Sequence, residues 1–240
     1  MQRAVLTRLH LSASSLKYLA LLAMTADHIA VICRPVPGFR TFGDLAFPLI
    51  AFLLVEGFFH TRDRRRYGWR LLLAAAVSEI PYDLAFSGQW MDAQHQNVCL
   101  TFFLALVAME LLERYGNGIW EKLVLTAVFC TLTEAAGADG GAWGMGLVLA
   151  FYFCVIGNSG TNVPRSILFH EKTAGVFMKM IAAVLIGAFV WQEPLWVLAL
   201  TAVCLLLYDG SKGRSRFRSF FYIYYPAHLL ALHFVGKWLG

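Results

Sequence analysis

The chain has 240 residues, of which 59% are hydrophobic and only 15% charged, with a formal net charge of +5. Soluble domains average about 45–50% apolar and about 25% charged residues, so this composition excludes an ordinary soluble protein. It is typical of an integral membrane protein, and the length fits one membrane-embedded domain spanning residues 1–240.

In chain order, the first apolar run follows the basic start MQRAVLTRLHLSASS. This start lacks the long apolar core and small-residue cleavage site of a secretory signal peptide, so we expect the first helix to be an uncleaved anchor. Apolar runs separated by loops rich in Gly and Pro predict nine helices. Their predicted limits are 15–34, 42–60, 69–87, 97–114, 119–136, 141–157, 173–191, 194–209 and 219–238.

Loop charges predict the orientation of these helices. The segments HTRDRRRYGWR, after the second helix, and SKGRSRFR, before the ninth, are rich in Arg and Lys. The loops QWMDAQHQ, TEAAGADGG and WQEP lack both residue types. The positive-inside rule places the basic segments in the cytoplasm. Nine transmembrane helices with a cytoplasmic N-terminus satisfy every loop, so we expect an all-α, multi-pass bundle.

Several ionisable residues fall inside predicted helices, where lipid penalises charge. Asp27 and His28 lie past the middle of the first helix, and Glu79 lies near the middle of the third. A charge at the bilayer centre costs about 2.5–3.5 kcal/mol on insertion scales, so such residues normally face the bundle interior. We expect these three to share one polar chamber. The residues alone leave open a catalytic base with its orienting groups or an ion or proton path.

Five blocks follow one another along most of the chain: LKYLALLAMTADHIA, FGDLAFPLIAFLLVEGFFHTRDRRRYGWRLLLAAAVSEIPYDLAF, QNVCLTFFLAL, GADGGAWGMGLVL and YYPAHLLAL. Together they resemble the TraX family, membrane proteins named for the enzyme that acetylates the N-terminus of conjugative F-pilin. The spacing Lys17-x10-His28 is also similar to the Arg/Lys-x10-His signature of bacterial membrane acyltransferases that modify surface sugars. Those enzymes take acyl groups from cytoplasmic acyl-CoA and deliver them outside.

These resemblances imply an acetyltransferase in the bacterial cytoplasmic (inner) membrane. It would move an acetyl group from acetyl-CoA, the donor substrate, to an amine or hydroxyl of a protein N-terminus or surface glycan. We expect no nucleic-acid partner, no prosthetic group and no metal, since the five cysteines show no CxxC spacing. Two alternatives stay open: a proton-coupled small-solute transporter, and a non-catalytic assembly factor for a surface appendage.

Site residues follow from these implications. The expected catalytic residues are His28, Asp27 and Glu79, with His28 as general base or transient acetyl carrier. Glu79 or Asp83 would orient the His28 ring through one imidazole nitrogen. The residues expected to bind acetyl-CoA are Lys17, Glu56, His60, Arg64, Arg65, Arg66, Arg70, Arg214, Arg216 and His228. The residues expected to bind the acceptor are Arg40, Tyr82, Asp83, Asn97, Thr101 and Tyr225.

Overall fold

The computed structural model describes residues 10–156, 195–213 and 220–239, and these residues form helices joined by turns. Helix α1 continues directly into a π-helical turn, η1, and a short helix α2 precedes α3. The elements are α1 (Ala13–His28), η1 (Ile29–Cys33), α2 (Phe39–Gly43), α3 (Ala46–His60), α4 (Arg64–Phe86), α5 (Val98–Tyr115), α6 (Ile119–Ala135), α7 (Gly141–Ile156), α9 (Leu195–Leu207) and α10 (Phe220–Leu239).

The helical character of the predicted segments is confirmed wherever the structure describes them, with two shifts of boundary. The segment predicted at 42–60 is divided into α2 and α3. The helix predicted from residue 69 begins at Arg64, because the Asp63 carboxylate caps it by accepting a hydrogen bond from the Arg66 amide at 2.9 Å. The segment predicted at 173–191 lies outside the described residues.

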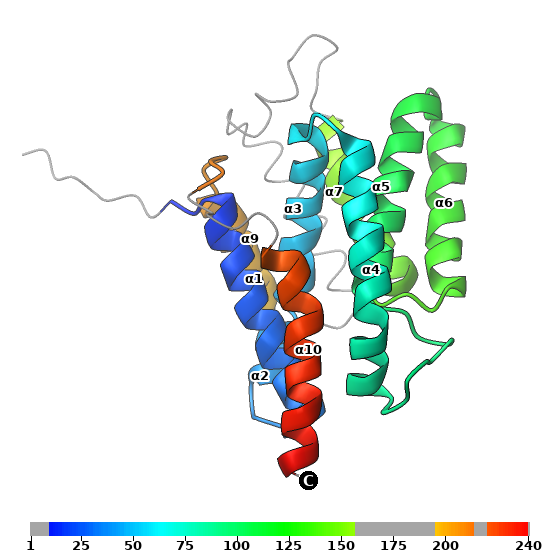
Figure 1. Ribbon diagram of the computed structural model, residues 1–240. Helices are drawn as coiled ribbons and strands as arrows, with labels where there is room; N and C mark the ends of the chain where they lie inside the picture. Colours follow the sequence, from blue (N-terminus) through cyan, green and yellow to red (C-terminus); the bar gives the residue numbers. More distant parts are fainter. Residues whose placement is uncertain (1–9, 157–194, 214–219, 240) are drawn as a thin grey trace, which may run out of the picture.

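Helices α3 to α7 stand side by side, and consecutive ones run in opposite directions (Figure 1). Their connections therefore gather at two ends of the bundle. We call the end with residues 61–63 and 116–118 the arginine end. We call the end with residues 87–97 and 136–140 the acidic end.

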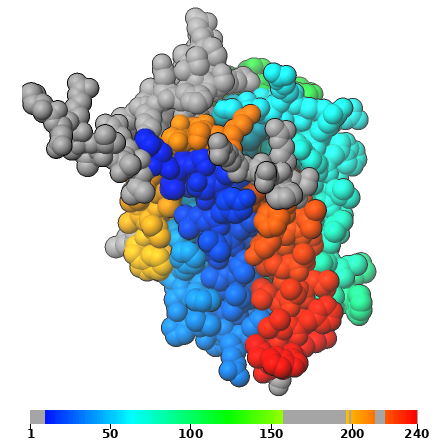
Figure 2. Space-filling model, turned by 60° about the vertical axis from the view of Figure 1, so that its left-hand side comes forward, coloured from blue at the N-terminus to red at the C-terminus, as the bar shows by residue number. Residues whose placement is uncertain are grey.

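The segments from the two termini complete the bundle. Helix α1 begins at the arginine end, next to the end of α9, where the Leu11 amide donates to the Leu207 carbonyl at 2.9 Å. Helix α10 runs beside α1 and reaches η1, where Cys33 Sγ lies 3.6 Å from the Leu232 carbonyl. One face of the molecule accordingly shows α1 between α9 and α10 (Figure 2).

The centre of the bundle is a cluster of aromatic rings between α3 and α7. Phe52 and Phe58 of α3 and Phe151 and Tyr152 of α7 are almost completely buried. Phe52 meets Phe151 edge to face at 6.2 Å, and Phe58 meets Tyr152 at 6.0 Å. Such pairs contribute about 0.5–1.5 kcal/mol each beyond the area they bury. They hold α3, which reaches from one polar end to the other, at the centre of the fold.

Two helical stretches of the described chain are long and apolar enough to cross a membrane. They are Ala13–Cys33 and Phe39–His60, and Gly141–Ile156 is a shorter apolar helix. The structure is thus all-helical with candidate membrane spans. The nine transmembrane helices expected from the sequence stay a prediction.

Candidate functional site

A pair of buried histidines joins α1 to α10. Nδ1 of His28, the last residue of α1, lies 2.7 Å from Nε2 of His228. The two ring planes are 7° apart and their centroids 5.0 Å apart, as expected for an edge-to-edge hydrogen bond between ring nitrogens. Each residue is only 8% exposed. The fold therefore brings together two titratable rings that are 200 residues apart in the chain.

The surroundings of the pair hold both rings in place. Nδ1 of His228 lies 3.0 Å from the Tyr224 carbonyl, one helical turn earlier in α10. The edge of Phe86 contacts His28 at a centroid distance of 5.3 Å, and Tyr225 lies 6.5 Å away. The α-helix ends at His28 and continues as the π-helical turn η1. Such turns occur frequently at functional sites.

Asp27 faces a different group from its neighbour His28. Its Oδ1 lies 3.6 Å from Nη1 of Arg40, whose side chain is 69% exposed. Gly43 packs directly against Asp27, so a side chain at position 43 would collide with it. Asp44 and Asp139 also lie within electrostatic range of Asp27. Asp27 therefore belongs to a charged cluster at the acidic end.

Glu79 and Asp83 of α4 are each held by one carboxylate oxygen. The Asn97 side chain, which caps α5, donates to the Ala75 carbonyl at 2.8 Å and to Oε2 of Glu79. Oδ2 of Asp83 accepts from the Asp92 amide at 2.9 Å. The second oxygens, Oε1 of Glu79 and Oδ1 of Asp83, are buried without a hydrogen-bond partner among the described residues. Such oxygens are able to accept hydrogen bonds from a ligand.

The residue that hydrogen-bonds His28 is thus His228, in place of the expected Glu79 or Asp83. Both carboxylates are engaged by the loop that leads into α5. His228, which was expected on the donor path, instead lies against the expected base.

A bridge between two loops closes the acidic end. The Asp139 amide donates to the Gln96 carbonyl at 2.8 Å, and the Thr101 hydroxyl donates to the Asp139 carbonyl at 2.6 Å. Burial raises the pKa of the Asp139 carboxyl, while the charge of Arg40 opposes that shift. Thr101, expected to bind the acceptor, therefore positions this turn. Asp139 was not among the expected site residues, because nothing in its local sequence distinguishes it from a solvated loop carboxylate.

The two tyrosines expected to bind the acceptor lie beside this cluster. Tyr82 packs on Phe86 with ring centroids 4.7 Å apart, and it lies within electrostatic range of Asp139 and Glu79. Tyr225 is buried and lies within range of Asp139 and Tyr82. The acidic end thus gathers residues from α1, α2, α4, α10 and the turn before α7.

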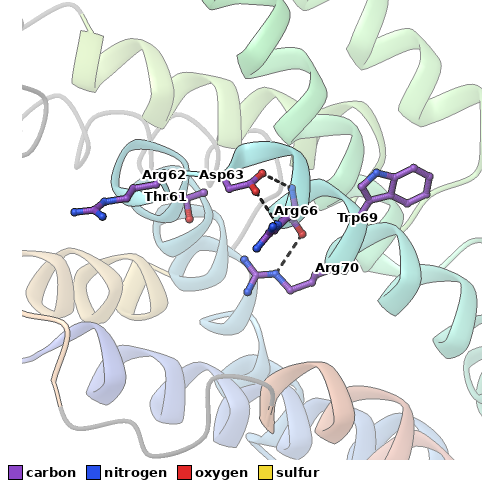
Figure 3. Close-up of a pocket in the computed structure, with 6 residues that line it drawn as sticks. All are labelled: Thr61, Arg62, Asp63, Arg66, Trp69 and Arg70. Atoms are coloured by element: carbon purple, nitrogen blue, oxygen red, sulfur yellow. Dashed lines mark hydrogen bonds and ion pairs between the residues drawn. The ribbon is translucent and has the colours of Figure 1, made fainter.

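A basic pocket of about 480 Å³ lies at the arginine end. Nε of Arg66 lies 2.9 Å from Oδ2 of Asp63, and Nε of Arg70 donates to the Arg66 carbonyl at 3.3 Å. The Arg62 side chain points away from these two (Figure 3). The full lining is Thr61, Arg62, Asp63, Arg66, Trp69 and Arg70.

Two other arginines expected at the donor site, Arg64 and Arg65, are described and do not line this pocket. Arg64 turns toward α5, where it forms ion pairs with Glu113 and, at 3.1 Å, with Glu110. Its guanidinium also covers the Phe58 ring at 3.9 Å, so it joins α3, α4 and α5. Arg65 is exposed but does not line the pocket. Arg214 and Arg216 lie outside the described residues.

A buried carboxylate lies on α3, about one helical turn inside the arginine end. Glu56 accepts a hydrogen bond from the Tyr208 hydroxyl, and its backbone carbonyl lies 2.9 Å from Nδ1 of His60. Lys17 lies within electrostatic range of Glu56, with its Nζ 5.5 Å from the centre of the Phe221 ring. Lys17, Glu56 and His60 are therefore close together, and their assignment to the donor path stays a prediction. Tyr208 was not expected, because its partner is 152 residues away.

Comparison with known proteins gives one family. Residues 12–236 match the model of the family described as TraX protein. A protein of Dichelobacter nodosus named "Probable fimbrial assembly protein FimC, serogroup H1" is 29% identical over 240 residues. That match covers 92% of this chain and 94% of the relative. No solved structure matches the chain.

Proposed function

The chain belongs to the TraX family, and from this premise we propose that it is an integral membrane acetyltransferase acting in pilin modification or pilus assembly. Acetyl-CoA is the donor, and the acceptor is an amine or hydroxyl of a protein N-terminus or a surface glycan. The observation that carries the proposal is the buried His28–His228 pair. Phe86, which contacts His28, belongs to α4, the helix that also carries two carboxylates with unused oxygens. A proton acceptor among fixed polar groups suits acyl transfer.

Exposed apolar side chains support a position inside a lipid bilayer. Helix α6 exposes Trp120, Val124, Val128 and Leu132, which form a stripe along one face. Lipid would solvate such a stripe, whereas water would not. Large aromatic rings lie more than half exposed near both ends, as in membrane aromatic belts. They are Trp69, Tyr115 and Trp120 near the arginine end and Trp90, Trp143 and Trp238 near the acidic end.

By the positive-inside rule, we expect the arginine end on the cytoplasmic side of the bacterial inner membrane and the acidic end on the outer side. Helix α3, with 15 residues, spans about 22 Å between them. In the proposed topology nine helices cross the membrane, with the N-terminus inside and the C-terminus outside.

Arg66 and Arg70 of the basic pocket have the chemistry for the phosphates of coenzyme A. Planar guanidinium groups bind phosphate oxygens in pairs and stay charged at all working pH values. The pantetheine arm would run inward past His60 and Glu56 for about 20 Å, the length that α3 sets.

The transfer step takes place at His28. The acceptor nitrogen or oxygen attacks the thioester carbonyl carbon, and His28 takes the proton that this atom loses. The carbon–sulfur bond then breaks, and the proton passes to the departing thiolate. Asp27 with Arg40, and Glu79 with Asn97, supply fixed charges and dipoles around the reacting atoms. Tyr82, Asp83 and Tyr225 face the acceptor.

Purified protein in nanodiscs, incubated with acetyl-CoA and a set of acceptors, tests the activity. The set contains a peptide with a free N-terminus, the same peptide with a blocked N-terminus, an amino sugar and a neutral glycan. We expect mass spectrometry to find one acetyl group on at least one acceptor, and no transfer by His28→Gln. Folded protein that binds acetyl-CoA but acetylates none of them would overturn the proposal.

A non-catalytic role in assembly is the second candidate, because the relative from Dichelobacter nodosus is named as a probable fimbrial assembly protein. This role predicts that pilus formation survives His28→Gln and Glu79→Gln. The acetyltransferase predicts that both variants lose the modification while still reaching the membrane.

A further inference from the structure

We propose that His228 is a positioning residue that selects the reactive tautomer of His28. The inference rests on the proposed function, since it says how the expected base is prepared. It depends on the direction of each hydrogen bond in a chain of three groups: the Tyr224 carbonyl, the His228 ring and the His28 ring.

The direction follows from the backbone. A carbonyl oxygen only accepts hydrogen bonds, so Nδ1 of His228, 3.0 Å from the Tyr224 carbonyl, carries a hydrogen. A neutral imidazole has one hydrogen, so Nε2 of His228 is an acceptor. Nδ1 of His28, 2.7 Å from it, must then donate. Both rings are buried, which disfavours a positive charge on either of them, so the neutral pair is the favoured state.

This arrangement leaves Nε2 of His28 unprotonated and able to accept a proton. With the hydrogen on Nδ1, the lone pair of His28 lies on Nε2. This nitrogen makes no hydrogen bond within the part of the chain that the structure describes, so it is available to an acceptor proton. The logic is that of a catalytic triad, in which a third group holds the imidazole in the correct tautomer.

A second contact fixes the register between the two helices. The Thr25 hydroxyl donates to the Leu21 carbonyl at 2.7 Å, so its oxygen accepts from the Tyr224 hydroxyl at 2.8 Å. The Tyr224 ring stacks on His228 with centroids 5.0 Å apart and planes 9° apart. Tyr224 thus supports the His228 ring that is hydrogen-bonded to His28, and it is anchored to α1 one turn before the histidine pair.

The tautomer is measured directly by solid-state or solution NMR of protein labelled with ¹³C and ¹⁵N in its seven histidines. The His28 signals are those missing from His28→Gln. We expect wild-type His28 to carry its proton on Nδ1 and His228→Asn to lose this preference. The matched control is His233→Gln, a buried histidine on the same helix, which should leave His28 unchanged. A wild-type proton on Nε2, or no change in His228→Asn, would overturn the proposal.

Two substitutions of His228 distinguish a role in positioning the His28 ring from a role in structural support alone. The oxygen of His228→Gln can replace Nε2 and accept from His28, whereas the amide of His228→Asn can replace only the bond to Tyr224. We expect the Gln variant to keep most of the kcat. We expect the Asn variant to lose about 10- to 100-fold, the range for removal of an orienting partner, with an unchanged KM for acetyl-CoA. Equal loss in both, or better function of Asn, would contradict the inference.

The two proposals fail in different ways. If wild-type His28 carries its proton on Nδ1 and no acceptor is acetylated, the acetyltransferase proposal is wrong and the tautomer assignment stands. If acetyl transfer is found and the tautomer is independent of His228, the positioning role is wrong and the activity stands.

Discussion

The two polar regions of this protein are built in opposite ways. The histidine pair joins residues 28 and 228, is buried, and depends on the packing of α10 against α1. The arginine pocket is lined by six residues between Thr61 and Arg70, is exposed, and is formed by one turn and the first part of α4. A local, exposed site tolerates single changes and responds to salt, whereas a buried pair between distant segments does not tolerate loss of either partner.

The largest effect is expected at the buried pair. His28→Gln should lower kcat for acetyl transfer by about 10²- to 10⁴-fold, the contribution of a general base. Acetyl-CoA affinity, measured by calorimetry, should change little because the arginine pocket is intact. The control is Leu22→Ala, an exposed residue on the same helix. An active His28→Gln protein would remove the histidine pair from the mechanism.

The next largest effect concerns the donor. The double variant Arg66→Ala/Arg70→Ala should weaken acetyl-CoA binding by about 10- to 100-fold, from the loss of one or two hydrogen bonds between charged groups. The kcat at saturating donor should remain near the wild-type value. Arg65→Ala is the matched control, since it removes a neighbouring exposed charge that does not line the pocket. Equal weakening by the control would mean that only net charge matters.

A smaller effect tests how the acidic end depends on close packing. Gly43→Ala should destabilise the fold by about 1–3 kcal/mol, because the new methyl group collides with the Asp27 side chain and lies 3.0 Å from its Cα. Gly146→Ala is the control, because a methyl group there meets nothing within 4 Å. It should stabilise α7 by about 0.5–1 kcal/mol. Thermal unfolding in detergent compares the two, and equal stability would show that Asp27 is not tightly packed.

The smallest expected effect is a difference in how the two regions respond to ionic strength. Raising salt from about 0.1 M to about 1 M shortens the Debye length from about 10 Å to about 3 Å. Acetyl-CoA affinity should fall several-fold, while the NMR signature of the His28 tautomer should not move. A His28 tautomer signature that changes with salt concentration would indicate that the histidine pair is open to solvent.

The same contrast explains what could be read from the sequence. Apolar runs and their Gly and Pro boundaries identify the described helices to within a few residues, because membrane-type hydropathy is a property of each segment alone. Clustered arginines such as Arg66 and Arg70 are visible for the same reason, since neighbours in sequence remain neighbours in the fold.

The partners of the buried residues could not be read in this way. Helices such as α3 and α7 are apolar nearly all round, so no stripe marks which face meets which neighbour. The pairs His28–His228 and Glu56–Tyr208 depend on the rotation of helices that are far apart in sequence. Asn97 was expected at the acceptor, but its contact with Glu79, which follows from its cap on α5, could not be read from the sequence.

Transfer across a sealed membrane tests the account most directly, because the donor and the acceptor are assigned to opposite ends. Proteoliposomes would enclose acetyl-CoA, with an amine or hydroxyl acceptor found active in nanodiscs added only outside. We expect acetylated acceptor outside with the wild-type protein, and none with His28→Gln or when donor and acceptor are both outside. Transfer that requires both substrates on the same side, or that persists in His28→Gln, would contradict it.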